Sequence, residues 1–143
     1  MQLEFYSLPM AVESIMHKQE LTKCSLHQSV MQHLHLLLTT SFGEFPADEI
    51  FGCGVWDHDF DIVTSAHKLK EMIRLSLMAS ITDQEKRLGN VRVEIVMKQE
   101  EIPASQSGRR VKKKIDITII GILKSTNERF AYRDSFFVGP LSY

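Results

Sequence analysis

The sequence has few of the features that mark secreted or membrane proteins. Its two cysteines, Cys24 and Cys53, lie far apart, so we expect reduced thiols in a cytosolic protein rather than a disulfide scaffold. No apolar run approaches the roughly 18 to 20 residues that a membrane-spanning helix needs, so no direct insertion into a membrane is expected. The residues from Met1 to Phe5 lack the basic and apolar stretches of a secretory signal.

The chain also has no large excess of positive or negative charge. The chain has 17 Lys and Arg against 18 Asp and Glu, a net charge of −1, so no overall field favours nucleic acid or an anionic membrane. Glycine-rich phosphate-binding motifs and Cys-x-x-Cys pairs are absent, and we therefore expect no cofactor and no metal. What is present is ordinary for one globular domain: 143 residues, of which 43% are hydrophobic and 24% charged.

Two segments have the apolar spacing of amphipathic helices. The first runs from Ser25 to Thr40, and Ser25 with Gln28 has the spacing of a capping box at its start. The second has apolar residues every four positions up to Ile81. The expected stripes are Leu26, Val30, Leu34, Leu37 and Leu38 in the first segment, and Leu69, Met72, Ile73, Leu77 and Ile81 in the second. Thr64 or Ser65 is expected to cap the second helix.

Two charges stand close together where the second helix gives way to a strand. Glu85 and Arg87 are two residues apart, and such residues do not face each other on a helix. Either the helix has loosened there, or the two charges point at different partners. Gly89 and Asn90 tolerate the positive φ that a helix stop needs. Since charges are rarely buried unpaired, we expect both to be only partly paired in the isolated domain, so that removing them costs little stability.

The last third of the chain has the two-residue period of strands. Apolar residues alternate with polar ones from Val91 to Lys98, from Ile115 to Ile119 and from Phe130 to Val138, with a turn at Ser125 to Asn127 between the last two. The alternation is lost around Gly121, which indicates burial on both faces or a bulge there. The expected fold is α+β, with two main helices packed on a three-stranded antiparallel sheet.

The two segments outside this pattern are harder to interpret. Residues 1–24 are expected to form an N-terminal arm or short helix, with weak helical periodicity from Met10 to Glu20, and residues 25–143 the main domain. The arm either lies on a partner or is a loosely packed terminus. Residues 41–56 combine three glycines and a proline with large apolar side chains such as Trp56. A loop this long and apolar must pack on the core or on a partner.

Catalytic candidates are few. Cys53 and His58 could act as nucleophile and base, but no third residue has a clear place to orient the histidine. Glu44 with one of the aspartates could form the carboxylate pair of a peptidoglycan-cleaving hydrolase, which is the alternative to a structural role.

Metal-ligating candidates are equally ambiguous. The acidic cluster at residues 57–61 could ligate a metal, and a solvated acidic turn before a helix explains it as well. His33 and His35 are two apart on a helix and cannot chelate one metal together, so both are expected to be exposed or half-exposed.

One basic run stands out near the end of the chain. Residues 109–114 contain Arg109 and Arg110 among five basic residues in six. The run could bind nucleic acid, or its lysines could protect an edge strand. We favour contact with an acidic protein partner and expect no nucleic-acid ligand.

The order of these motifs resembles the gene product 25-like family of phage baseplate wedge proteins, and within it the branch found in type VI secretion. The similarity runs from about Ser25 to Val138. The family's hallmark at the helix–strand junction is Glu-Pro-Arg; Glu85 and Arg87 match it, and Lys86 replaces the proline. Since proline would fix φ, the rigidity of the junction is the property that this replacement changes.

The resemblance implies a structural baseplate subunit and not an enzyme. Family members of this branch lie in the baseplate wedge beside TssF, TssG and TssK, in the cytoplasm at the inner face of the cell envelope. Their sheet is the surface on which the first ring of the sheath subunits TssB and TssC assembles, by strand addition at an open edge. The residues that we assign to partner binding on this basis are Glu85, Arg87, Leu88, Trp56, Arg109 and Arg110.

Overall fold

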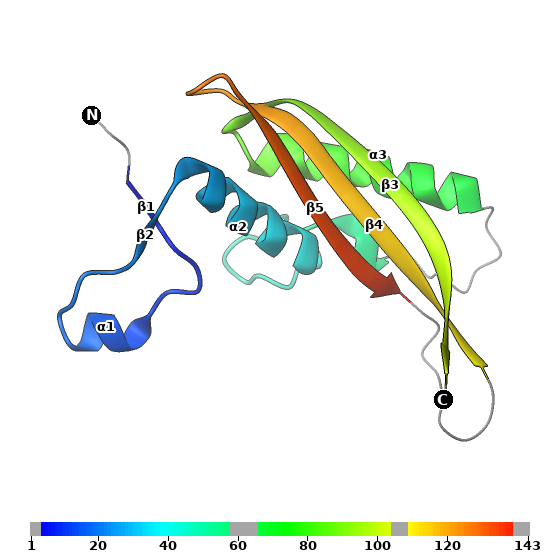
Figure 1. The fold of residues 1–143 in the computed structure, drawn as a ribbon, viewed down its shortest axis with the longest axis horizontal. Helices are drawn as coiled ribbons and strands as arrows, with labels where there is room; N and C mark the ends of the chain where they lie inside the picture. The colour runs from blue at the N-terminus through cyan, green and yellow to red at the C-terminus, as the bar shows by residue number, and fades with distance from the viewer. Residues whose placement is uncertain (1–3, 58–65, 104–108, 139–143) are drawn as a thin grey trace.

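The computed structural model describes residues 4–57, 66–103 and 109–138. Two main helices cover one face of a three-stranded antiparallel sheet, and a small N-terminal arm precedes them (Figure 1). This is the α+β architecture expected from the sequence. Among the residues described, no helix combines the length and the apolar character required to cross a membrane.

The first main helix, α2 (Leu26–Thr39), begins where the capping box predicts. The Gln28 N–H donates to Ser25 Oγ at 3.2 Å, and the Ser25 N–H donates to the Gln28 side-chain oxygen at 3.1 Å. These bonds satisfy two N–H groups that have no partner within the helix. Four residues of the predicted stripe are fully buried: Val30, Leu34, Leu37 and Leu38.

The second main helix, α3 (Ala66–Gln84), carries the four-residue repeat of apolar side chains. The buried members of the stripe are Leu69, Ile73, Leu77 and Ile81. Met72 is exposed, so the buried stripe is narrower than predicted. Thr64 and Ser65, the predicted caps, lie outside the described residues.

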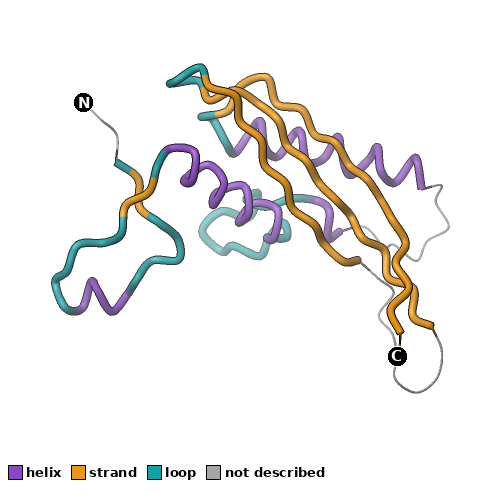
Figure 2. The backbone as a smooth tube through the Cα atoms, viewed as in Figure 1, coloured by secondary structure: helices purple, strands orange, loops and turns teal. Residues whose placement is uncertain are grey.

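The sheet consists of β3 (Leu88–Pro103), β4 (Arg109–Leu123) and β5 (Glu128–Val138), in that spatial order and all antiparallel (Figure 2). The connection from β4 to β5 is the turn predicted at Ser125 to Asn127. Asn127 has a φ of 57°, and its N–H donates to the Leu123 carbonyl at 2.8 Å. A side chain that tolerates the left-handed region therefore closes this hairpin.

A β-bulge lies at the start of β3. The register shifts between Gly89 and Arg92, so that two residues, Asn90 and Val91, stand opposite Gly121 alone. The extra residue is thus on β3, whereas the lost alternation had placed the irregularity on β4. A Cβ on Gly121 would lie only 3.0 Å from the Gly89 carbonyl oxygen. Glycine at position 121 therefore allows β3 and β4 to approach this closely.

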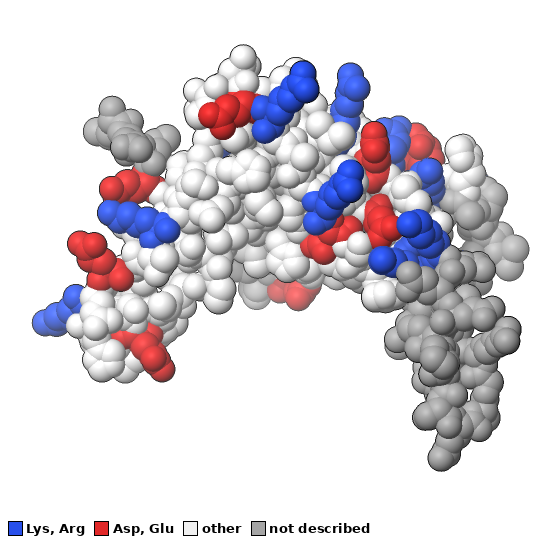
Figure 3. Space-filling view, in the orientation of Figure 1, with Lys and Arg blue, Asp and Glu red and all other residues white. Residues whose placement is uncertain are grey.

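The core lies between the helices and one face of the sheet. In Figure 1, α3 crosses behind β3 and β4, and α2 lies beside β5. The sheet residues that point into the core include Val93, Ile95, Ile115, Ile117, Ile119, Phe130 and Tyr132. On the face toward the viewer, Figure 3 shows Lys and Arg interspersed with Asp and Glu, so neither sign of charge dominates this outer face.

The loop after α2 folds back on the end of that helix. The Cys53 N–H donates to the Thr40 carbonyl at 3.0 Å, and Gly52 between them has a φ of 127°. The loop leads into a 3-10 turn, η1 (Gly54–Asp57), where Val55 is buried. Phe42, Phe45 and Ile50 are nevertheless exposed, so the loop both packs on the core and presents apolar surface.

The N-terminal arm is a two-stranded ribbon with a short helix. β1 (Phe5–Tyr6) pairs with β2 (Lys23–Cys24), and α1 (Val12–Met16) lies in the excursion between them. No residue of α1 is buried. The excursion projects from the rest of the molecule (Figure 1). The expected short helix is thus present within the range Met10 to Glu20.

Candidate functional site

The junction between α3 and β3 surrounds Glu85, the one charged residue found buried among those whose burial the structure describes. The helix ends at Gln84, the chain turns at residues 86 and 87, and β3 begins at Leu88. The helix has therefore ended before Glu85, which frees Glu85 and Arg87 to face each other. Gly89 and Asn90 do not end the helix as predicted, because they already belong to β3; Asn90 does take a positive φ, of 49°.

The Glu85 carboxylate is the centre of this junction. It is only 2% exposed. Its Oε1 accepts from the backbone N–H of Arg87 at 3.0 Å and from Arg87 Nε at 2.8 Å. Its Oε2 accepts from Arg87 Nη2 at 2.8 Å and lies 2.6 Å from His33 Nδ1. The prediction that Glu85 and Arg87 are only partly paired is therefore wrong, because both carboxylate oxygens bind partners from within the chain.

Burial and pairing oppose each other in setting the charge of this carboxylate. Burial alone would raise the pKa of Glu85, since it disfavours the charged form. The hydrogen bonds from the Arg87 side chain, from His33 and from the Arg87 backbone outweigh it and hold the pKa at about 2. Glu85 is thus a carboxylate that joins the end of α3 to α2 and to the start of β3, and it has no proton to donate near neutral pH.

Arg87 links this centre to α2 and to the arm. Its Nη1 donates to Ser29 Oγ at 2.8 Å, and its Cζ lies 5.4 Å from the centre of the Phe5 ring. The Arg87 side chain remains 32% exposed. It borders a cleft of about 410 Å³ that Tyr6 and Leu8 of the arm also line. Arg87 is therefore the member of the pair that a partner can reach.

Sequence reasoning missed the contribution of α2 to this site. His33 is half-exposed, within the predicted range, but its contact with Glu85, 52 positions further along the chain, was not predicted. Ser29 and His33 are four residues apart and share one side of α2, next to the buried Val30 and Leu34. A polar pair beside an apolar stripe was the available signal, but nothing local indicated its partner.

The other predicted partner-binding residues lie apart from the junction or inside the domain. Leu88 follows the junction directly and is buried in the core. Arg109 and Arg110 lie at the opposite end of the β3–β4 hairpin, where they pair with Pro103 and Ile102. Trp56 belongs to η1. The side chains of Trp56, Arg109 and Arg110 are outside the described part of the structure.

The catalytic and metal candidates find little support in their surroundings. Cys53 is fully buried, and its Sγ lies 3.3 Å from the Leu38 carbonyl, so it is inaccessible as a nucleophile. His58 and most of the acidic cluster fall outside the described residues. Within the ranges that are described, no three His, Cys, Asp or Glu side chains gather as metal ligands would. Glu44 is exposed and accepts from the Ser41 N–H at 2.8 Å, which closes a loop.

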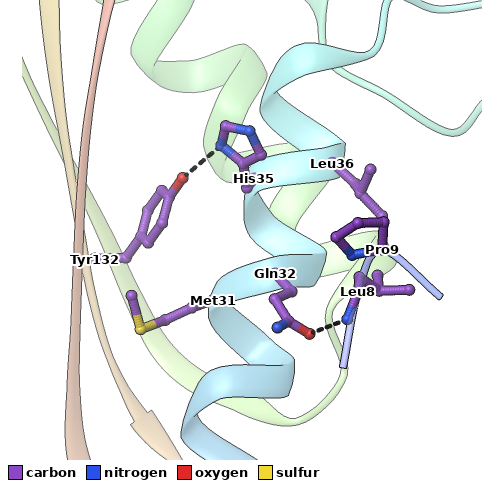
Figure 4. A pocket seen from close by; sticks show the side chains of 7 residues that line it. All are labelled: Leu8, Pro9, Met31, Gln32, His35, Leu36 and Tyr132. Carbon is purple, nitrogen blue, oxygen red and sulfur yellow. Dashed lines mark hydrogen bonds between the residues drawn. The ribbon is translucent and has the colours of Figure 1, made fainter. Parts of the chain in front are cut away.

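A second cleft, of about 450 Å³, lies on the outer side of α2 (Figure 4). On one side of the helix, the Leu8 N–H of the arm donates to Gln32 Oε1 at 3.1 Å. On the other side, His35 Nδ1 lies 3.2 Å from Tyr132 Oη and 2.9 Å from Asp134 Oδ2. Burial, together with the hydrogen bond to Asp134, raises the pKa of Tyr132 well above its usual range. These contacts tie the arm and β5 to α2.

Known proteins are similar to this chain in fold and in sequence. The crystal structure of a protein assigned as a tail lysozyme, from Geobacter sulfurreducens, superposes with a TM-score of 0.58 at 21% identity, covering 83% of this chain and 96% of that one. At this identity the likeness shows the fold. None of the curated proteins matches the chain. The baseplate wedge protein gp25 family matches residues 24–128, which is most of the chain and includes both helices and the junction. The chain therefore belongs to the gp25 family of baseplate wedge proteins.

Proposed function

We propose that this protein is a structural baseplate subunit of a contractile injection machine of the type VI secretion kind, in the position that TssE occupies there. The observation that carries the proposal is the family match over residues 24–128. It would act in the cytoplasm, at the inner face of the envelope, where it joins the baseplate wedge to the sheath.

The open edges of the sheet support a role in sheath assembly. β4 is the central strand, and β3 and β5 each pair with β4 alone among the described strands. These edge strands span 16 and 11 residues, long enough to add a strand from another chain. We assign the added strand to the first ring of sheath subunits, TssB and TssC.

The junction supports a contact with the wedge proteins TssF, TssG and TssK. Arg87 is the partly exposed member of the Glu85–Arg87 pair, so we assign direct contact to Arg87. Glu85 and Leu88 are buried and act by positioning it. Trp56, Arg109 and Arg110 are assigned to further contacts with these partners, with Arg109 and Arg110 facing an acidic surface.

The alternative is a hydrolase, which the assignment of the Geobacter protein as a tail lysozyme favours. Glycosidases of the usual kind need two carboxyl groups that flank the scissile bond. The cleft beside Glu44 is lined by Leu36, Thr40, Phe45 and Phe51, and within the described residues no second carboxylate lines it. We therefore propose no enzymatic activity.

One comparison of two readouts tests this choice. Fluorescent sheaths are counted in cells that lack the protein and carry either the wild type or Glu44→Gln, and the purified proteins are mixed with cell walls. We expect sheaths only when the protein is present, equal numbers with Glu44→Gln, and no loss of cell-wall turbidity. Turbidity loss that Glu44→Gln abolishes, or normal sheaths without the protein, would contradict the proposal.

A further inference from the structure

A groove with acidic walls lies between the loop after α2 and the last turns of α3. Its volume is about 650 Å³. Phe42, Ile50 and Ala79 supply its apolar surface, and Glu49 and Asp83 stand on its walls. It shares neither the Phe5–Arg87 contact of the junction nor an edge of the sheet. Gln84 lines both this groove and the cleft beside Arg87, and the other lining residues of the two sites differ.

The apolar surface of this groove continues along α3. Ile50 is 66% exposed and Phe42 43%. Met72, Leu75 and Ala79 are spaced three and four residues apart and so share one exposed side of the helix. The Phe42 ring lies beside this helix, because a Cβ on Gly54 would be 3.4 Å from the ring and 2.6 Å from Ser76 Oγ. Apolar side chains therefore line the groove and recur beyond it on the same side of α3.

The charged residues that line the groove itself, Glu49 and Asp83, are both acidic, although the chain as a whole is nearly neutral. Residues 41–57 contain four acidic residues and no Lys or Arg. Asp83 approaches Lys86 Nζ only to 4.0 Å, with both side chains exposed, and such pairs contribute little. The carboxylates of Glu49 and Asp83 can therefore pair with positively charged groups of a ligand.

The chemistry of the groove also restricts the kind of ligand. It has helix and loop backbone around it and no open strand edge, so a partner must bind through side chains, as an amphipathic helix does. In a second copy of the chain, α1 and α2 contain no Lys or Arg, and α3, which contains Lys68, Lys70 and Arg74, already forms one wall of the groove. We therefore take another protein as the occupant and test self-association separately.

We propose that this groove binds a basic amphipathic helix of a neighbouring protein in the assembled baseplate. Apolar side chains of that helix, spaced three and four apart, lie on Ile50, Phe42 and Ala79. Its flanking Lys or Arg side chains lie against Glu49 and Asp83. The inference uses membership of the baseplate family and does not depend on strand addition to the sheath.

A designed pair of peptides tests this inference on the full chain. One labelled helix-forming peptide carries a leucine stripe flanked by lysines, and its twin has glutamate in place of every lysine. Fluorescence anisotropy gives the affinity at low and high salt. We expect saturable binding of the lysine peptide, weakened by salt, and binding of the twin at least about tenfold weaker.

Variants locate the binding. Glu49→Gln with Asp83→Asn should weaken the lysine peptide about three- to tenfold and flatten the salt dependence, and Ile50→Ser should weaken it at any salt. The matched control is Glu94→Gln with Val96→Ser, an acidic and an apolar residue exposed on the outer face of the sheet. Circular dichroism checks that each variant is folded.

Three outcomes would overturn the inference. The first is no binding, or equal binding of both peptides. The second is an equal effect of the groove and control variants, which would mean non-specific association. The third is concentration-dependent self-association that Ile50→Ser abolishes, which would make a second copy the occupant. Sheath formation in cells is measured separately. A failure of the peptide to bind would therefore contradict the groove proposal without contradicting the proposed baseplate function.

Discussion

The Oε2 atom of Glu85 and the Nδ1 atom of His33 lie 2.6 Å apart, and this contact fastens the end of α3 to the side of α2. Through Arg87 the same carboxylate also holds the start of β3. Three elements thus meet at one buried charge, and removing Arg87 or His33 leaves that charge with fewer partners.

Glu85→Gln should therefore destabilise the domain. The amide keeps the shape but loses the charge that pairs with Arg87, and we expect a loss of about 2 to 3 kcal/mol in the free energy of unfolding. Urea denaturation measures it. Glu94→Gln, an exposed residue on the sheet, is the control and should change the free energy by about 0.5 kcal/mol or less. Equal stability of the two variants would mean that the pairing contributes nothing.

The stabilisation by Glu85 should also depend on pH. Because its pKa is lowered to about 2 in the folded state, its contribution is fully present above the unfolded pKa and is lost as the pH falls through the folded pKa. The difference in unfolding free energy between the wild type and Glu85→Gln should shrink between about pH 5 and pH 2. A difference that stays constant over this range would show that the folded pKa is not lowered.

Arg87→Ala should cost more than its partial exposure indicates. It leaves the Glu85 carboxylate buried with His33 as its remaining side-chain partner, so we expect a loss of about 3 kcal/mol. Lys86→Ala is the neighbouring control, since Lys86 is exposed, and should stay within about 0.5 kcal/mol of the wild type. Thermal melting compares the two. An Arg87→Ala melting curve that overlays that of Lys86→Ala would contradict the network described for the junction.

Phe5→Ala should loosen the arm and leave the domain intact. It removes the ring that stacks on Arg87, and the global stability should fall by about 1 kcal/mol or less. Limited proteolysis should nevertheless cut the arm faster than in the wild type. Met16→Ala, which alters a largely exposed side chain on α1, is the control and should be cut at the wild-type rate. Unchanged cleavage of Phe5→Ala would mean that the ring does not hold the arm.

Two glycines of the loop after α2 give a matched comparison of backbone strain. Gly52→Ala would place a Cβ 2.6 Å from the Thr40 carbonyl oxygen at a φ of 127°, and should cost about 2 kcal/mol or more. Gly43→Ala has a φ of 80° and nothing within 4 Å of its Cβ, so about 1 kcal/mol is expected. Chemical denaturation of both variants measures the gap. Similar losses would show that the close approach at Gly52 relaxes without cost.

The parts of the fold that repeat along the chain could be predicted from the sequence. The spacing of Val30, Leu34 and Leu37 predicts α2, because a helix places residues with this spacing on the same side. The capping box at Ser25 predicts where the helix begins. The alternation of apolar and polar residues around Ile115 predicts β4, because successive side chains of a strand point to opposite faces of the sheet. Periodicity also predicted one buried residue too many. It assigned Met72 to the buried stripe, but Met72 lies on a side of α3 that does not contact the core.

The candidate site could be predicted only in part, because its contacts join residues distant in the sequence. Glu85 and Arg87 were singled out at the junction, but only partial pairing was predicted; because the helix ends at Gln84, the two side chains contact each other directly. The contributions of His33 and Phe5 depend on how α2 and the arm are placed, which no local pattern encodes. A bulge at Gly121 was one of two explanations for the lost alternation, and choosing it and assigning the extra residue to β3 required the register of both strands.

The direct succession of β2 and α2 has a mechanical consequence. Cys24 ends the ribbon of the arm, and Ser25 caps the helix, so no slack separates the two. A pull on the arm is delivered to the first turn of α2 and, through the Phe5 contact, to Arg87. A force on the arm therefore meets the charged contacts of Arg87 and Glu85 as well as the buried apolar side chains of α2. In a machine that contracts, tension applied at the amino terminus would be resisted at the junction, where α2, α3 and β3 are joined through the Glu85 carboxylate.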